Sequence, residues 1–202
     1  MWMWIRQTLR QLCIALGVSL CLWPVFSLAN ESDSVAFEDR EPGFKVLVTS
    51  TEELNDVLRL SAGFDLMLSE ELTKAVHSGV AIRLNVEMEV WRERSYWLDS
   101  NVATVIQSYL LEYNALTRRY VLENSNTTAH YSLPSLAAAV GVMSGLKDFP
   151  FLDSSLLKPE HRYYARMRIL IDVDSLPVPL RVMAYISSRW HLTSDWYRWP
   201  LR

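Results

Sequence analysis

Residues 82–90 read Ile-Arg-Leu-Asn-Val-Glu-Met-Glu-Val, and this alternation decides the fold. Every second residue is apolar, and the residues between are polar or charged. Because successive side chains of a β-strand point to opposite faces of a sheet, the stretch predicts a strand with one buried and one solvated face. Glu87, Glu89 and Trp91 then share the solvated face.

Two other stretches, residues 58–68 and 163–173, alternate in the same way. Weaker strand candidates are residues 45–51, 102–113, 118–123, 127–131, 180–188 and 195–201. Pro177 and Pro179 have no backbone N–H to donate, so the strand at 180–188 is expected to begin after them or to lie at a sheet edge. Sheets with one wet face are usually antiparallel. The pattern predicts an all-β fold, mainly an antiparallel β-sandwich, with two short helices.

The first of these helices is expected at residues 70–78. Ser69 precedes it as an N-cap, and Gly79 follows it as a stop signal. The second is expected at residues 134–144, with Ser132 or Leu133 before it, because proline is favoured at the first position of a helix.

The N-terminal residues 1–29 have the layout of a secretory signal peptide. Arg6 and Arg10 are followed by an apolar run at residues 12–22, and Ser-Leu-Ala at 27–29 ends the segment with small residues. We expect export across the inner membrane, cleavage after residue 29, a periplasmic location and no membrane insertion after cleavage. The alternative is an uncleaved segment that anchors the protein in the inner membrane.

The rest of the chain divides into a loose polar leader at residues 30–43 and a β-sandwich domain at residues 44–202. Both cysteines, Cys13 and Cys21, precede these segments, so the mature domain has no disulfide and no thiol nucleophile. The chain is acidic, with a formal net charge of −3, which argues against nucleic-acid binding. No histidine pair has a metal-type spacing and no cofactor motif occurs, so no metal and no cofactor are expected.

Two glutamates are the only candidates for catalysis. Glu87 and Glu89 point the same way along one strand, and a carboxylate pair can serve as acid and base on a glycosidic bond. Arg166 and Arg168 offer a matching face of another strand. If these strands are neighbours, the four residues form cross-strand ion pairs, and this structural interpretation is the one we favour.

Aromatic side chains supply the candidate binding residues. They cluster after the strand at 82–90 and near the C-terminal end, where such rings either stack on ligands, anchor a partner or fill the ends of the sandwich. Together with one arginine, the candidates are Trp91, Trp97, Tyr113, Arg118, Tyr120, Trp190 and Trp196.

Several segments carry a resemblance to a known family. Residues 113–120, Tyr-Asn-Ala-Leu-Thr-Arg-Arg-Tyr, match a Y-x-A-L-T-R-x-Y pattern. Residues 172–180, residues 190–196, and Lys158-Pro159 followed by residues 164–166 match later signatures. Over residues 45–199 the chain resembles an uncharacterised family of exported bacterial proteins, domain of unknown function 4390.

The resemblance implies a small envelope protein of Gram-negative bacteria with a leader segment and a link to envelope sensing, and it supplies no catalytic residue. We therefore expect a non-enzymatic periplasmic interaction module that binds an envelope or membrane protein through an edge strand or an aromatic patch. The alternative is a glycan-binding or glycan-cleaving domain that uses surface tryptophans and tyrosines with Glu87 and Glu89.

Overall fold

The computed structural model describes residues 41–187 and 189–201. The chain divides into two compact units, Met1–Arg40 and Glu41–Arg202, and the fold described here is that of the second unit. The signal peptide or anchor expected at residues 1–29 lies outside the described residues, as does most of the leader expected at 30–43. The described part of this leader ends at Gly43, where the first strand begins.

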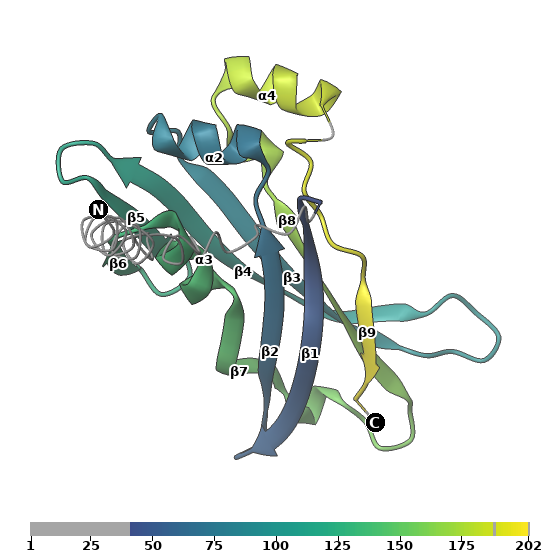
Figure 1. The fold of residues 1–202 in the computed structure, drawn as a ribbon. Helices are drawn as coiled ribbons and strands as arrows, with labels where there is room; N and C mark the ends of the chain where they lie inside the picture. The colour runs from purple at the N-terminus through teal and green to yellow at the C-terminus, as the bar shows by residue number, and fades with distance from the viewer. Residues whose placement is uncertain (1–40, 188, 202) are drawn as a thin grey trace, which may run out of the picture. The chain divides into compact units, whose positions relative to one another are not determined.

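Two antiparallel sheets form the domain, as the alternation predicted (Figure 1). The larger sheet has the spatial order β6 (Ala129–Leu133), β5 (Arg119–Asn124), β4 (Ser100–Asn114), β3 (Ile82–Arg92), β8 (Tyr163–Ile171) and β9 (Tyr197–Pro200). The smaller sheet has the order β1 (Gly43–Leu54), β2 (Val57–Met67) and β7 (Gly145–Asp153). The helices are α2 (Glu70–His77), α3 (Leu136–Met143) and α4 (Val178–Ile186), with single 3-10 turns η1 (Ser154–Leu156) and η2 (Val173–Ser175).

The core lies between the facing sheets and forms one hydrophobic cluster. Phe64 of β2, Val86 of β3 and Ile169 of β8 are exposed by 5%, 0% and 0%. Alternate residues of β2, β3 and β8 are buried, as the sequence predicted. This interior removes apolar surface from water, which is the main favourable term for a domain without cross-links.

The predicted helix boundaries are close to the observed ones. Ser69 caps α2, and its Oγ accepts a hydrogen bond from the backbone N–H of Leu72 at 3.2 Å. Gly79 follows with φ of 82°, a conformation that glycine adopts without strain. The N-cap of α3 is Ser135, not Ser132 or Leu133, so Pro134 precedes the helix instead of starting it.

Two elements differ from the prediction. Residues 180–188 were expected to form a strand, but Val178–Ile186 is the helix α4, with proline in its first turn. Residues 41–187 and 189–201 therefore contain three short helices instead of the predicted two. The strand β7 was not expected, because Pro150 and two shifts in its pairing with β2 interrupt its alternation.

The long hairpin of β3 and β4 gives the molecule an arm. Residues 92–100, here called the hairpin arm, extend beyond the body of the sandwich (Figure 1). At another end of the domain, α2 and α4 lie close together near the start of β3. These two regions carry the surfaces described next.

Candidate interaction surfaces

The outer face of the larger sheet carries the ion pairs that the sequence predicted. Glu87 lies opposite Arg168 and Glu89 lies opposite Arg166, because β3 and β8 are antiparallel neighbours. The Nε atom of Arg168 donates to Oε2 of Glu87 at 2.7 Å, and Nε of Arg166 donates to Oε2 of Glu89 at 2.8 Å. Both carboxylates thus form ion pairs with arginines. The four residues form the cross-strand ion pairs that the sequence analysis favoured.

Two tryptophans stack on the same arginines. The guanidinium carbon of Arg166 lies 4.7 Å from the ring centroid of Trp91 and 4.2 Å from that of Trp196. Arg168 lies 4.5 Å from the Trp196 centroid. The indole N–H of Trp91 also donates to Oε2 of Glu89 at 2.6 Å. We call these residues the arginine–tryptophan cluster: Glu87, Glu89, Trp91, Arg166, Arg168 and Trp196.

The ring contacts within this cluster compete with the stacking of a sugar. A carbohydrate stacks on the open face of an aromatic ring, whereas guanidinium groups occupy ring faces of both Trp91 and Trp196. The two indoles are half-buried, and they come from segments far apart in the sequence. The cluster therefore fastens the segment before β9 onto the outer face of the sheet.

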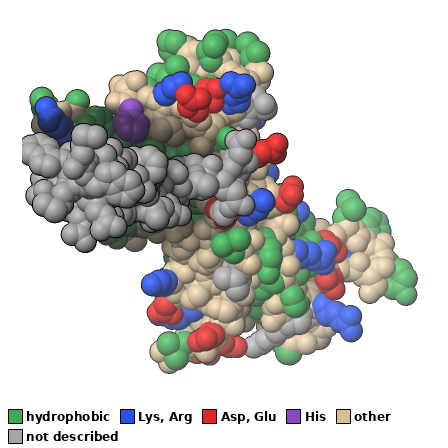
Figure 2. Space-filling model, viewed as in Figure 1, with side chains coloured by type: hydrophobic (Ala, Val, Ile, Leu, Met, Phe, Trp, Pro, Cys, Tyr) green, Lys and Arg blue, Asp and Glu red, His purple; other side chains and the backbone are tan. Residues whose placement is uncertain are grey.

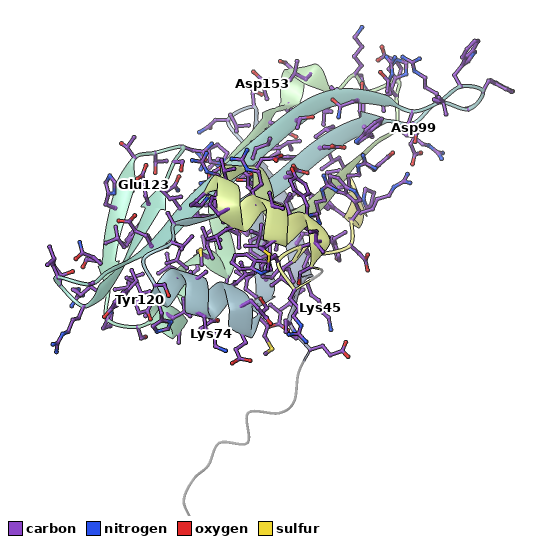
Figure 3. The ribbon with its side chains drawn as sticks, turned by 90° about the horizontal axis from the view of Figure 1, so that it is seen from above. Lys45, Lys74, Asp99, Tyr120, Glu123 and Asp153 are labelled. Atoms are coloured by element: carbon purple, nitrogen blue, oxygen red, sulfur yellow. The ribbon has the colours of Figure 1, made fainter. Side chains whose placement is uncertain are left out.

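A second polar network braces the base of the hairpin arm. The hydroxyl of Tyr164 donates to Oδ2 of Asp99 at 3.0 Å, and the backbone N–H of Arg94 donates to Oδ1 of Asp99 at 3.2 Å. Arg198 forms an ion pair with Glu93 at 2.6 Å and stacks on the Tyr164 ring at 3.4 Å. Burial and the hydrogen bond to Asp99 raise the pKa of Tyr164. Figure 3 shows Asp99 where the arm leaves the sheet.

The tip of the arm is apolar and almost fully exposed. Tyr96, Trp97 and Leu98 are consecutive residues with exposed fractions of 93%, 81% and 89%. Apolar side chains appear at the end of this projection in the space-filling view (Figure 2). Of the predicted aromatic candidates after β3, Trp97 is thus free, while Trp91 is held in the arginine–tryptophan cluster.

The predicted candidates Tyr113 and Tyr120 belong to a different place and have a structural role. They pair across β4 and β5, with their ring centroids 5.0 Å apart. The hydroxyl of Tyr120 hydrogen-bonds to Nε2 of His77, and Nδ1 of His77 donates to the carbonyl of Thr73 at 2.9 Å. These contacts fix the end of α2 on the larger sheet, and burial raises the pKa of Tyr120.

The other residues of the Y-x-A-L-T-R-x-Y pattern lie in or beside the turn that joins β4 and β5. The side-chain oxygen of Asn114 accepts from the backbone N–H groups of Leu116 and Thr117, both at 3.0 Å. Arg118 is exposed and has φ of 53°, in the left-handed region. Arg119 donates to Oγ and to the carbonyl of Ser132, both at 2.7 Å, so it pairs with β6 and not with an acid.

The helix α4 carries an apolar surface that the sequence prediction missed. Its outward side chains are Val178, Val182, Met183, Tyr185 and Ile186, exposed by 69%, 57%, 59%, 58% and 82%. We call these five residues the α4 patch. Only Ala184 of this helix is fully buried, while Leu180 packs partly against the core. The signal for this helix was present in Pro177 at its N-cap and Pro179 in its first turn, and in the i, i+4, i+8 spacing of Val178, Val182 and Ile186.

Polar groups border the α4 patch. Lys74 pairs with Glu70 at 2.5 Å within α2, and Arg189 pairs with Glu71 at 2.7 Å. The hydrogen bond from Arg189 holds the pKa of Glu71 below its usual range. The hydroxyl of Ser69 donates to the carbonyl of Arg189 at 2.7 Å, which ties the segment after α4 to α2. Figure 2 shows apolar side chains gathered at the top of the view, next to acidic and basic side chains.

The last predicted candidate, Trp190, is 9% exposed and belongs to the core. Among residues 41–187 and 189–201, no group of three or more His, Cys, Asp or Glu side chains is placed to hold a metal ion. No helix within these ranges is long and apolar enough to cross a membrane.

Residues 42–200 match the family model described as "Domain of unknown function (DUF4390)". The chain belongs to this family. The match covers all the strands and helices described above, from β1 to β9. The chain matches no curated protein and no solved structure.

Proposed function

We propose that this DUF4390 protein is an exported, non-enzymatic interaction module that docks on an envelope or membrane protein in the periplasm. The observation that carries the proposal is the α4 patch. Five large apolar side chains stand on one face of a nine-residue helix, each exposed by more than half. A contiguous apolar surface rimmed by polar groups is typical of a protein-interaction site.

The composition of the patch favours a protein as the occupant. Interface centres are enriched in methionine and aromatic residues and poor in charge, with polar residues at the rim. Met183 and Tyr185 supply the first feature, and the ion pairs Glu70–Lys74 and Glu71–Arg189 supply the second. The unbranched thioether of Met183 can adapt to an irregular partner surface.

The export part of the proposal rests on the sequence of residues 1–29, and the link to envelope sensing rests on the family resemblance. The glycan alternative is less well supported. Glu87 and Glu89 are each bound by an arginine, and a guanidinium lies over each of the two indole rings of the arginine–tryptophan cluster.

Site-specific crosslinking in living cells tests the proposal. A photo-crosslinking amino acid replaces Val182 or Ile186, and Val142 provides the matched control because it is a valine on another short helix with 38% exposure. We expect the same protein adduct from positions 182 and 186 and none from 142. The adduct formed from 186 should disappear when Val182→Ser and Met183→Ser are added.

Two outcomes would contradict the proposal. One is the absence of any protein adduct at both α4 positions. The other is an adduct that forms equally well from position 142, because such a contact would not depend on the α4 patch.

A further inference from the structure

The tip of the hairpin arm is a second exposed apolar surface, separate from the α4 patch. Tyr96, Trp97 and Leu98 follow one another in the sequence and are among the most exposed large side chains of the described domain. They stand at the end of a projecting hairpin (Figure 1). A convex apolar tip cannot enclose a ligand. It can instead insert into a lipid bilayer or into a pocket on another protein.

The arm is held so that the tip stays away from the rest of the protein. Asp99 accepts hydrogen bonds from the hydroxyl of Tyr164 and from the backbone N–H of Arg94. The Arg198–Glu93 ion pair and the hydrogen bond from Glu93 N–H to the carbonyl of Arg162, at 2.9 Å, fasten the other side. These contacts at the base of the arm therefore keep the tip exposed.

Arginines lie at the base of the hairpin arm, although the chain as a whole is acidic. In the described part of the chain, Arg92, Arg94 and Arg162 form no ion pair, whereas Glu93 is neutralised by Arg198. The hollow at the base of the arm is lined by Glu93, Arg94, Ser95, Asp99, Glu160, His161 and Arg162. Among the described residues of this lining, Asp99 and Glu160 are carboxylates without an ion pair, because Asp99 accepts hydrogen bonds only from neutral donors. Within the residues that the structure describes, three arginines without an ion pair, Arg92, Arg94 and Arg162, thus stand against two such carboxylates, Asp99 and Glu160, at the base of the arm.

We propose that the hairpin tip docks on the surface of a phospholipid bilayer that contains anionic lipids. Tyrosine and tryptophan favour the headgroup region, where the ring is buried and the polar N–H or O–H stays wet. Leu98 adds an apolar side chain, and Arg92 and Arg94 can extend toward lipid phosphates while their stems cover apolar surface. This inference goes beyond the proposed protein partner and beyond the expectation of no membrane insertion.

A bilayer fits the tip better than a pocket on a protein. Protein interfaces of standard size bury about 800 Å² on each partner. The tip offers only three apolar residues, and its neighbours Arg94, Ser95 and Asp99 are polar. A cation-flanked aromatic tip of this size is sufficient for shallow, reversible attachment to lipid headgroups.

Vesicle co-sedimentation tests the inference with the protein isolated from the cell envelope. Vesicles of phosphatidylglycerol and phosphatidylethanolamine are compared with vesicles of phosphatidylcholine alone. All variants carry the same N-terminal residues, so any binding of that segment to the vesicles is the same in every protein compared. We expect the wild type to bind the anionic vesicles and Tyr96→Ser/Trp97→Ser/Leu98→Ser to bind at least about tenfold less tightly.

Two further variants separate the parts of the mechanism. Leu116→Ser is the matched control, because Leu116 is 96% exposed at the tip of a different hairpin, and it should bind like the wild type. Arg92→Gln/Arg94→Gln should weaken binding to anionic vesicles only, and added salt should remove most of the difference. Tryptophan emission should be quenched by brominated lipids in the wild type and much less in Trp97→Phe, which still binds.

Three results would overturn the inference. The first is that the wild-type protein binds neither kind of vesicle. The second is that the triple serine variant binds as tightly as the wild type. A crosslinker at position 97 that captures one protein, while vesicles do not bind, would assign the tip to a protein pocket instead. Each result is independent of crosslinking at the α4 patch.

Discussion

The guanidinium carbon of Arg166 lies 4.2 Å from the centroid of the Trp196 indole. Arg166 belongs to β8, and Trp196 directly precedes β9. The contact therefore fixes the entry to β9 on the outer face of the larger sheet. The segment before it is also paired with β8, since Ser194 N–H donates to the carbonyl of Ile169 at 2.8 Å. Together they hold the connection between α4 and the edge strand in place.

Removal of the Trp196 ring should destabilise the domain. Trp196→Ala deletes a half-buried indole and two stacked guanidinium contacts, so we expect a loss of about 2 kcal/mol in the free energy of unfolding. Trp97→Ala is the matched control, because that ring is 81% exposed, and its effect should stay within about 0.5 kcal/mol. Urea unfolding followed by circular dichroism measures both, and equal effects would show that the stack adds nothing.

The hairpin turn at residues 115–118 should respond in opposite ways to two substitutions. Asn114→Ala leaves the N–H groups of Leu116 and Thr117 without their acceptor and should cost about 1 kcal/mol of unfolding free energy. Arg118→Gly relieves a left-handed backbone, with φ of 53°, and should raise stability by up to about 1 kcal/mol.

Chemical unfolding measures both changes in stability, and crosslinking from the α4 patch tests Arg118 as a binding residue. If Arg118 has only a structural role, the Arg118→Gly variant should form the crosslinked adduct through α4 as the wild type does. If this variant is stable but loses the crosslinked adduct, the exposed side chain of Arg118 takes part in binding after all.

The sandwich could be predicted because its strands must separate a dry face from a wet one. Phe64, Val86 and Ile169 follow that rule, and the sequence shows it directly. The same rule wrongly predicted a strand at residues 180–188, because apolar residues also alternate there, at Leu180, Val182, Ala184 and Ile186. A run of this length satisfies both a strand and a helix period, and the proline in the first turn, Pro179, favours the helix.

The candidate sites were harder to predict than the fold. Trp91 and Trp97 are six positions apart, yet Trp91 is half-buried against an arginine and Trp97 is exposed. The difference depends on Arg166, which reaches Trp91 from a strand distant in the sequence. Such pairings are set by sheet order, and local periodicity contains no information about that order. The α4 patch was missed for a related reason, since apolar residues in a predicted strand were assumed to face the core.

Alkaline pH should unfold the domain through its buried tyrosines. Burial raises the pKa of Tyr109 and Tyr120 above the ordinary value of 10.0. The folded chain then holds these phenolic protons more tightly than the unfolded chain does. The resulting stabilisation is complete below pH 10.0 and is lost as the pH rises through the folded-state values.

Tyrosinate absorbance and near-ultraviolet circular dichroism measure this effect during a pH titration. The free energy of unfolding of Tyr120→Phe should decline less steeply at alkaline pH than that of the wild type. An identical decline in both proteins would assign alkaline unfolding to other groups.

Glutamine substitutions of the paired glutamates distinguish an ion pair from an acid–base pair. Glu87→Gln should lower stability only when Arg168 is present, and a double-mutant cycle with Arg168→Gln should give a coupling of roughly 0.5 kcal/mol. The titration of tryptophan fluorescence with peptidoglycan fragments should be the same in Glu87→Gln/Glu89→Gln as in the wild type, with no ligand-dependent shift in either. A shift that appears in the wild type and vanishes in the variant would instead favour the glycan alternative, because the two carboxylates would then contact the sugar.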